Sequence, residues 1–249
     1  LAAVLESAGS WRSAYAVLAA PLAITVAVHW LGLRAPWTPT LATDEIGRRQ
    51  ERPRRRRDPV LRERQFLIVV AAMTLAGFAI YAAMINLVPL LVETGFSTQQ
   101  AAVVLAVGGI GQVAGRIAYA PVLGRATTDT KVTVVLLVTT AATLGLAAAP
   151  DPLLALCAIS VVAGTARGAF TLIQATAVTD RWGTASYGAR SSVLSGGVHL
   201  AAATGPWLGA LAAAALGGYQ PAFVLLAACA FFAAALSRVG ARDRPSIGP

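Results

Sequence analysis

The sequence contains few charged residues. Lys, Arg, Asp and Glu make up 12% of its 249 residues, about half of the roughly 25% that soluble domains carry. Fifteen of the 31 charges lie in residues 34–64, which leaves 16 for the other 218 residues, too few to cover a soluble surface. Because 57% of the chain is apolar, the composition excludes a water-soluble globule and predicts an integral membrane protein.

The chain is also poor in the residue types that form catalytic and metal sites. Its two cysteines lie in apolar runs, which favours small buried side chains over a disulfide framework or a metal cluster. Paired carboxylates within apolar runs and a glycine-rich phosphate loop are missing. The single lysine, Lys131, lies between two apolar runs, so it cannot hold retinal as a buried Schiff base. We therefore expect no catalytic residue, no metal, no cofactor and no enzyme.

Long apolar runs are the main feature of the sequence. A bilayer core about 30 Å thick requires roughly 20 residues of apolar helix. Seven stretches of suitable length carry at most one charge each: 14–33, 65–92, 101–123, 132–149, 153–179, 191–216 and 221–236. These predict an all-α integral membrane protein with seven transmembrane helices.

The distribution of Arg and Lys predicts the orientation, because cytoplasmic connections retain an excess of both. Residues 34–64 contain ten, and every second connection after them is also basic, as is the tail 237–249. The intervening turns, around Glu93, around Asp151 and at 217–220, contain none. We therefore expect a multi-pass protein of the cell inner (plasma) membrane, with the linker and the C-terminus in the cytoplasm.

Residues 34–64 are the one sizeable hydrophilic segment, and residues 54–57 are four arginines in succession. This segment is predicted to be a basic cytoplasmic linker. Binding to nucleic acid is the alternative, but the segment lacks interleaved aromatic residues, and basic runs beside a membrane helix usually contact anionic lipid headgroups. We expect the lipid bilayer as a partner and no nucleic acid.

Two arginines and one histidine lie deep inside predicted spans, where a charge is costly and usually functional. Arg116 lies roughly 12 Å from the predicted cytoplasmic end of its helix, Arg167 roughly 18 Å and His199 about 12 Å, at 1.5 Å per residue. No acidic residue lies at these depths. The alternative for Arg116 is that its long side chain extends to the interface; for His199 it is a packing role.

Polar and small residues around these positions recur at helical spacing. In one helix they are Ser160, Gly164, Arg167, Thr171 and Gln174, in a second Gln112, Arg116 and Tyr119, and in a third Ser192, Ser195 and His199. Steps of three and four place each set on one helix face. Such faces are consistent with a shared aqueous cavity, and also with hydrogen bonds between helices. Glycines four apart, such as Gly111 and Gly115, indicate close helix packing.

The order of these features resembles the C-terminal part of a major facilitator superfamily transporter. Residues 9–15 (Gly-Ser-Trp-Arg-Ser-Ala-Tyr) resemble the start of its sixth helix, and Gly115-Arg116 with 121–125 (Pro-Val-Leu-Gly-Arg) resembles the loop after its eighth. The spans would then be helices six to twelve. The resemblance implies that residues 1–33 hold an external hairpin tip and the last helix of the N-terminal half, and that 65–236 form the six-helix C-terminal half.

The later helices resemble the monocarboxylate and oxalate/formate branch of that family. The similar residues are Arg167-Gly168, Gln174-Ala175-Thr176, 180–183 (Asp-Arg-Trp-Gly), Tyr187-Gly188, and Gly205-Pro206 with Gly209. In that branch an arginine of helix eight binds the substrate carboxylate, which implies this role for Arg116. Gln112 occupies the position of a proton-coupling aspartate, and His199 is the nearest counterpart of a second basic residue in helix eleven.

We therefore expect a secondary active transporter that moves a small solute, an organic anion, by alternating access. Arg116 is the expected anion-binding residue, Arg167 and His199 add positive potential, and neutral contacts come from Gln112, Tyr119, Thr171 and Gln174. The alternatives are an exporter of drugs or neutral metabolites from the same superfamily, and a membrane receptor or scaffold without transport.

The expected partners are the small-molecule substrate, a coupled proton or counter-anion, and the N-terminal half of the same transporter. Five helices of the family pattern are missing, and the sequence opens on Leu1 rather than Met. We therefore expect the chain to be part of a longer one.

Overall fold

The computed structural model describes residues 11–32, 58–149, 151–184 and 186–242. The chain divides into two units, of which the first ends at Arg57 and the second begins at Asp58. The expectations for the opening residues, for most of the linker and for the end of the tail concern 1–10, 33–57 and 243–249, which lie outside the described residues.

In the first unit, the described residues form one long helix, α2 (Trp11–Gly32). Its segment Tyr15–Gly32 is long and apolar enough to cross a membrane. Pro21 lies inside the helix, and the Thr25 hydroxyl donates a hydrogen bond to its carbonyl oxygen at 2.8 Å. The Thr25 hydroxyl therefore has its hydrogen-bond partner in the preceding turn of the same helix.

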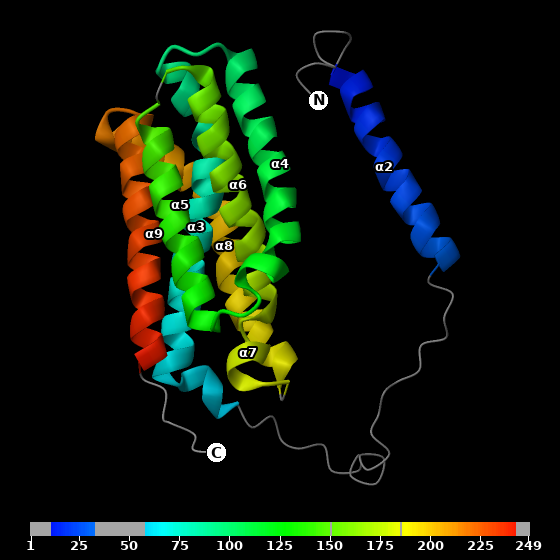
Figure 1. The fold of residues 1–249 in the computed structure, drawn as a ribbon, viewed down its shortest axis with the longest axis vertical. Coiled ribbons are helices and arrows are strands. Elements are labelled where there is room, and N and C mark those ends of the chain that lie inside the picture. Colours follow the sequence, from blue (N-terminus) through cyan, green and yellow to red (C-terminus); the bar gives the residue numbers. More distant parts are fainter. Residues whose placement is uncertain (1–10, 33–57, 150, 185, 243–249) are drawn as a thin grey trace. The chain divides into compact units, whose positions relative to one another are not determined.

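The second unit is a bundle of long helices that run alternately up and down (Figure 1). They are α3 (Arg64–Glu93), α4 (Thr98–Leu123), α5 (Thr128–Ala147), α6 (Leu153–Thr176), α8 (Tyr187–Leu216) and α9 (Tyr219–Arg242). Two short elements, the 3-10 helix η2 (Pro59–Arg62) and α7 (Thr179–Trp182), lie at one end. With α2, the described residues contain 7 helices that meet the requirements for membrane spans, so the predicted all-α membrane fold is confirmed.

Some helix ends differ from the predicted spans. Helix α6 ends at Thr176, before a turn that leads into α7, and α9 continues beyond the predicted end of its span to Arg242. In this extension Ser237 is buried and donates to the Ala234 carbonyl at 2.8 Å. The Gly240 carbonyl accepts a hydrogen bond from Nε2 of Gln65 at 3.0 Å. Packing against α3 therefore extends α9 into the segment that the sequence assigns to the tail.

Helices α4 and α6 pack with their backbones in contact. A Cβ atom placed on Gly164 would overlap the Gly108 carbonyl oxygen, and one on Gly168 would overlap that of Gln112. In the other direction, a Cβ on Gly111 or Gly115 would overlap backbone oxygens of α6. The glycine spacing that predicts close packing therefore describes this helix pair, and the approach brings polar side chains of α4 and α6 within reach of each other.

Helix α3 packs along both α8 and α9. Asn86 of α3 is buried and donates from Nδ2 to the Ala82 carbonyl at 2.9 Å and to the Pro206 carbonyl of α8 at 3.3 Å. Both α3 and α8 continue as helices past their internal prolines, Pro89 and Pro206. The α3–α8 contact is thus fixed by an interhelical hydrogen bond as well as by packing.

Two of the connections on the side opposite α7, those from α3 to α4 and from α8 to α9, are short and fixed by side-chain hydrogen bonds. Ser97 and Gln100 form a capping box at the start of α4, with bonds of 2.9 and 3.2 Å. The Glu93 carboxylate at the end of α3 accepts hydrogen bonds from the Tyr219 amide at 3.0 and 3.3 Å. An anion at the amino end of α9 also complements the helix dipole, so Glu93 ties α9 to α3.

Candidate anion-binding site

Arg167 lies in the middle of α6 and is buried, with 9% of its surface exposed. Its Nε donates a hydrogen bond to Oε1 of Gln112 on α4 at 3.1 Å. Its electrostatic neighbours are Tyr81 and Arg116, neither of which is an anion at neutral pH. Among the described residues, ion pairs with carboxylates are found for Arg181 and Arg190 but not for Arg167. A buried charge normally has an ionic partner, so this guanidinium is exceptional.

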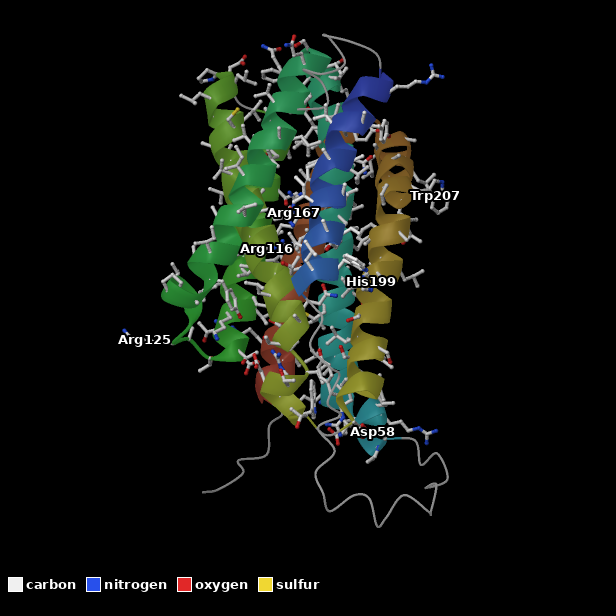
Figure 2. All side chains as sticks on the ribbon, turned by 90° about the vertical axis from the view of Figure 1, so that its right-hand side faces the viewer. Asp58, Arg116, Arg125, Arg167, His199 and Trp207 are labelled. Atoms are coloured by element: carbon white, nitrogen blue, oxygen red, sulfur yellow. The ribbon has the colours of Figure 1, made fainter. Side chains whose placement is uncertain are left out.

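Arg116 lies one helical turn beyond Gln112 on α4 and is exposed. Its Nε donates to Oγ1 of Thr171 on α6 at 3.4 Å, and the Thr171 hydroxyl in turn donates to the Gly168 carbonyl at 2.8 Å. Arg116 and Arg167 therefore bridge the same two helices in opposite directions, and Figure 2 shows both at about the middle of the bundle's length. In the described part of the chain, their hydrogen bonds use Nε alone, which leaves the terminal nitrogens of both for other partners.

The other predicted site residues are more dispersed. His199 is exposed on α8, which packs on α3, whereas α4 packs on α6 (Figure 2). Tyr119 packs against the apolar core, with Nζ of Lys131 5.7 Å from its ring centroid. Gln174 is half-buried on α6. The structure thus brings together Gln112, Arg116, Arg167 and Thr171, but neither Tyr119 nor His199 is held in that cluster by a hydrogen bond among the described residues.

A small cavity of about 40 Å³ lies beside Arg167, between α3, α4, α5 and α6. Its polar lining consists of Arg167, Ser160, Thr139 and Thr143, and the remaining lining residues are apolar or glycine. About 10–15 Å³ of such space holds one water. The cavity therefore has room for a few waters or for a small ion.

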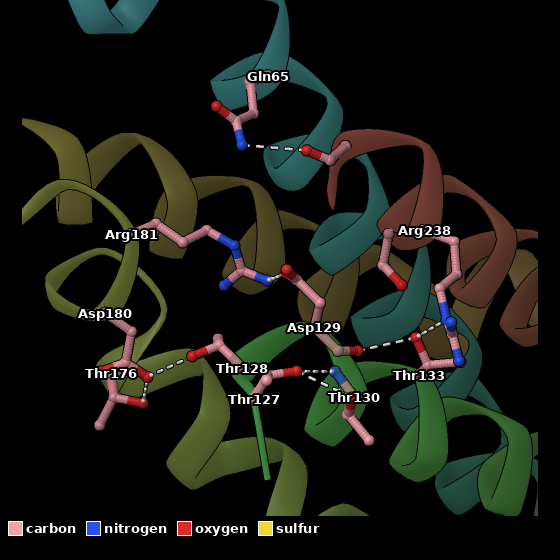
Figure 3. A network of polar contacts seen from close by, with 12 residues as sticks. Gln65, Thr127, Thr128, Asp129, Thr130, Thr133, Thr176, Asp180, Arg181 and Arg238 are labelled. Carbon is pink, nitrogen blue, oxygen red and sulfur yellow. Dashed lines mark hydrogen bonds and ion pairs between the residues drawn. The ribbon is translucent and has the colours of Figure 1, made fainter. Parts of the chain in front are cut away.

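A second polar cluster lies at the end of the bundle that carries α7 (Figure 3). Nη2 of Arg181 pairs with Oδ1 of Asp129 at 2.9 Å. Oδ2 of Asp180 accepts hydrogen bonds from the hydroxyls of Thr176 at 3.1 Å and Thr128 at 3.4 Å. These contacts join the first turn of α5 to α7 and the end of α6. The sequence places Asp129, Asp180 and Arg181 in basic connections but does not predict their pairing.

Asp58, just before η2, forms an ion pair with Arg190 in the first turn of α8. Nε of Arg190 lies 2.7 Å from Oδ2 of Asp58, and both side chains are 9% exposed. Nη1 of Arg190 also donates to the Trp182 carbonyl at 3.0 Å. The hydrogen bond from Arg190 is the main cause that lowers the pKa of the Asp58 carboxyl. The last residues of the predicted linker are therefore anchored to α7 and α8.

We expect Asp58→Asn to lower the unfolding temperature of the chain at pH 7. A carboxyl whose pKa is lower in the folded than in the unfolded state stabilises the fold above the unfolded value of about 3.9, and this contribution is lost as the pH falls through the folded pKa. The difference between variant and wild type, measured by thermal unfolding in detergent, should therefore shrink from pH 7 towards pH 3. Asp151→Asn, at an exposed carboxylate, is the control. A difference that is independent of pH would contradict the role of the Asp58 charge.

Comparison with known proteins places the chain in a family. A family model described as Major Facilitator Superfamily matches residues 1–152, which is more than half of the chain. The matched segment contains α2 to α5 and Arg116, and it ends before α6. A search of curated proteins finds no match. Together with the 7 apolar helices of the described residues, the family match shows that this multi-pass membrane protein belongs to the major facilitator superfamily, whose members are membrane transporters.

Proposed function

We propose that the chain is part of a transporter for a small organic anion and that Arg116 binds the carboxylate of that anion. The observation that carries the proposal is the unbalanced positive charge at mid-height of the bundle. Arg116 and Arg167 both lie there, whereas the described acidic residues all lie at helix ends or in connections: Asp58, Glu63, Glu93, Asp129, Asp151 and Asp180. Charges inside a membrane are costly and are usually retained for substrate or ion binding.

The geometry of Arg116 suits a carboxylate. Thr171 holds Nε at 3.4 Å, so Nη1 and Nη2 can bind both oxygens of one carboxylate in parallel. The exposed position of Arg116 leaves it accessible to a substrate. Arg167 is buried inside the bundle and supports this site indirectly. Its hydrogen bond fixes the side chain of Gln112, which lies one helical turn from Arg116. Thr171 and Gln174 provide further neutral hydrogen-bonding groups on α6.

We further propose that the six-helix unit is the C-terminal half of the transporter and that α2 is the helix before the linker. The substrate would bind between this half and an N-terminal half, and alternating access would follow from the rocking of one half against the other. The basic connections support a cytoplasmic position for the end that carries α7. Resemblance to the monocarboxylate and oxalate/formate branch supports an organic anion as the solute.

The charge of the ligand is the property to test. Purified chain in lipid nanodiscs is heated with matched pairs of ligands, such as propionate and propionamide, or succinate and succinamide, at constant ionic strength. A ligand that binds the folded state raises the unfolding temperature as its concentration increases. We expect the acids to do so and the amides not. Equal effects of acid and amide would favour an exporter of neutral compounds, and no effect of any ligand would favour a receptor or scaffold.

We expect His199→Gln to weaken anion binding more at acidic than at alkaline pH. Protonated imidazole adds a positive charge on α8, whereas neutral imidazole adds none, and His199 is exposed in the middle of that helix. Titration of a carboxylate ligand at several pH values would measure the effect. Equal losses at all pH values would show that the imidazole charge does not contribute.

A further inference from the structure

The charge of Arg167 requires a partner that the described protein groups do not provide. Its side chain is more than nine-tenths buried, and its one hydrogen bond among the described residues goes to a neutral amide, that of Gln112. An uncompensated guanidinium in a low-dielectric interior strongly destabilises the folded state. Arg116 nearby increases the positive potential further. These surroundings favour an anion close to Arg167.

The cavity beside Arg167 contains a second hydrogen-bond donor. Thr139 lines it but donates to the Val135 carbonyl at 2.8 Å, and Ser160 donates to the Val104 carbonyl at 2.7 Å. Thr143, also buried, has no hydrogen bond within the described part of the chain. Its hydroxyl is therefore available to donate into the cavity.

The size and walls of the cavity restrict what can bind. At about 40 Å³ it has room for an ion slightly larger than a water molecule. Its lining is mostly apolar, so a divalent sulfate or phosphate would lose more hydration energy on entry than a monovalent ion. No acidic side chain lines it, and Ile80, Leu87 and Leu105 contribute apolar walls. Apolar walls strengthen the attraction between a guanidinium and an anion, because the local dielectric constant is low.

We propose that this cavity binds one small monovalent inorganic anion of the size of chloride, as a fixed counter-ion of Arg167. The guanidinium supplies the charge and Thr143 a hydrogen bond. The site is distinct from the organic-anion site, because Arg116 is exposed and does not line the cavity. The halide neutralises the buried charge of α6 at the point where α6 packs against α4, so it stabilises this helix pair.

Thermal unfolding of the chain in nanodiscs tests the proposal, with chloride as the probe and sulfate as the replacement salt at constant ionic strength. For the wild type, the unfolding temperature should rise with chloride concentration, and bromide should replace chloride. Arg167→Gln should lose this dependence. In chloride-free buffer this variant should be at least as stable as the wild type, since the uncompensated charge is gone. A wild type insensitive to chloride, or an unchanged chloride response in Arg167→Gln, would overturn the proposal.

A milder pair of variants keeps the test decisive should Arg167→Gln not fold. Thr143→Val removes the available hydroxyl and should raise the chloride concentration for half-maximal effect roughly tenfold or more, as expected for one hydrogen bond to a charged group. Thr140→Val is the matched control, because its hydroxyl donates to the Leu136 carbonyl at 2.9 Å and does not line the cavity. Equal chloride responses in these two variants would contradict the site.

The chloride site and the organic-anion site can fail independently. Arg116→Gln should keep the chloride response while it loses affinity for carboxylates, and Thr143→Val should show the reverse. If chloride has no effect but carboxylates still bind through Arg116, only the inorganic site is wrong. If chloride binds but acids and amides are equivalent ligands, only the organic-anion proposal is wrong.

Discussion

Arg116→Gln should reduce the affinity for an organic anion by roughly tenfold to a hundredfold. A hydrogen bond between charged groups contributes about 1.5 to 3 kcal/mol, and each 1.4 kcal/mol is about a factor of ten in affinity. Glutamine retains a polar side chain but lacks both the charge and the paired terminal N–H groups. Binding of a carboxylate ligand to wild type and variant in nanodiscs, at matched protein concentration and fixed chloride, measures the loss.

Arg116→Lys separates charge from geometry. It should recover only part of the affinity, because an ammonium group cannot form the two parallel hydrogen bonds of a guanidinium. Arg125→Gln is the matched control, since Arg125 is exposed and lies beyond the end of α4. This variant removes the same charge outside the span. Unchanged affinity in Arg116→Gln, or an equal loss in Arg125→Gln, would show that Arg116 extends to the interface or packs without binding the anion.

The membrane fold was predictable from the sequence because its cause is local. A helix that crosses a bilayer needs about 20 apolar residues whatever its neighbours are, so each span can be recognised independently. The glycine spacing at Gly111, Gly115, Gly164 and Gly168 also predicts close packing, because the absence of a side chain allows two backbones to approach. It does not reveal that the partners are α4 and α6.

The burial of Arg167 could not be predicted in the same way. Periodicity places Arg116 and Arg167 on polar helix faces, but which face lies inside the bundle depends on how all the helices pack. The structure places Arg167 inside, bonded to Gln112, and leaves Arg116 exposed. The two arginines that the sequence assigned to one site therefore have different surroundings, and we propose different ligands for them.

The ion pair between Asp58 and Arg190 joins residues 132 positions apart in the sequence. No local pattern connects them, because both lie in segments where charged residues are ordinary. The sequence shows a basic linker and a basic connection, which predict topology. Only the folded arrangement shows that a carboxylate at the end of the linker neutralises an arginine at the start of α8, where a positive charge is unfavourable for the helix dipole.

Gly111→Ala should destabilise the chain by about 1 to 3 kcal/mol, the usual cost of an added group in a tightly packed interior. The new methyl group would overlap the Val161 carbonyl oxygen of α6, which is backbone and cannot rotate away. The helices must separate, and van der Waals contact between them is a main source of their association in lipid. Thermal unfolding in nanodiscs should show a lower midpoint.

Gly109→Ala provides the matched control for this prediction. Gly109 lies on the same helix, but a Cβ there has no neighbour within 4 Å. Alanine should be neutral or stabilising by up to about 1 kcal/mol, since it lowers the entropy cost of the helix. Separation of α4 from α6 also moves Arg116 away from Thr171 and Gln112 away from Arg167, so Gly111→Ala should weaken carboxylate binding whereas Gly109→Ala should not. Equal unfolding midpoints in the two variants would show that the α4–α6 backbone contact does not determine the stability of the bundle.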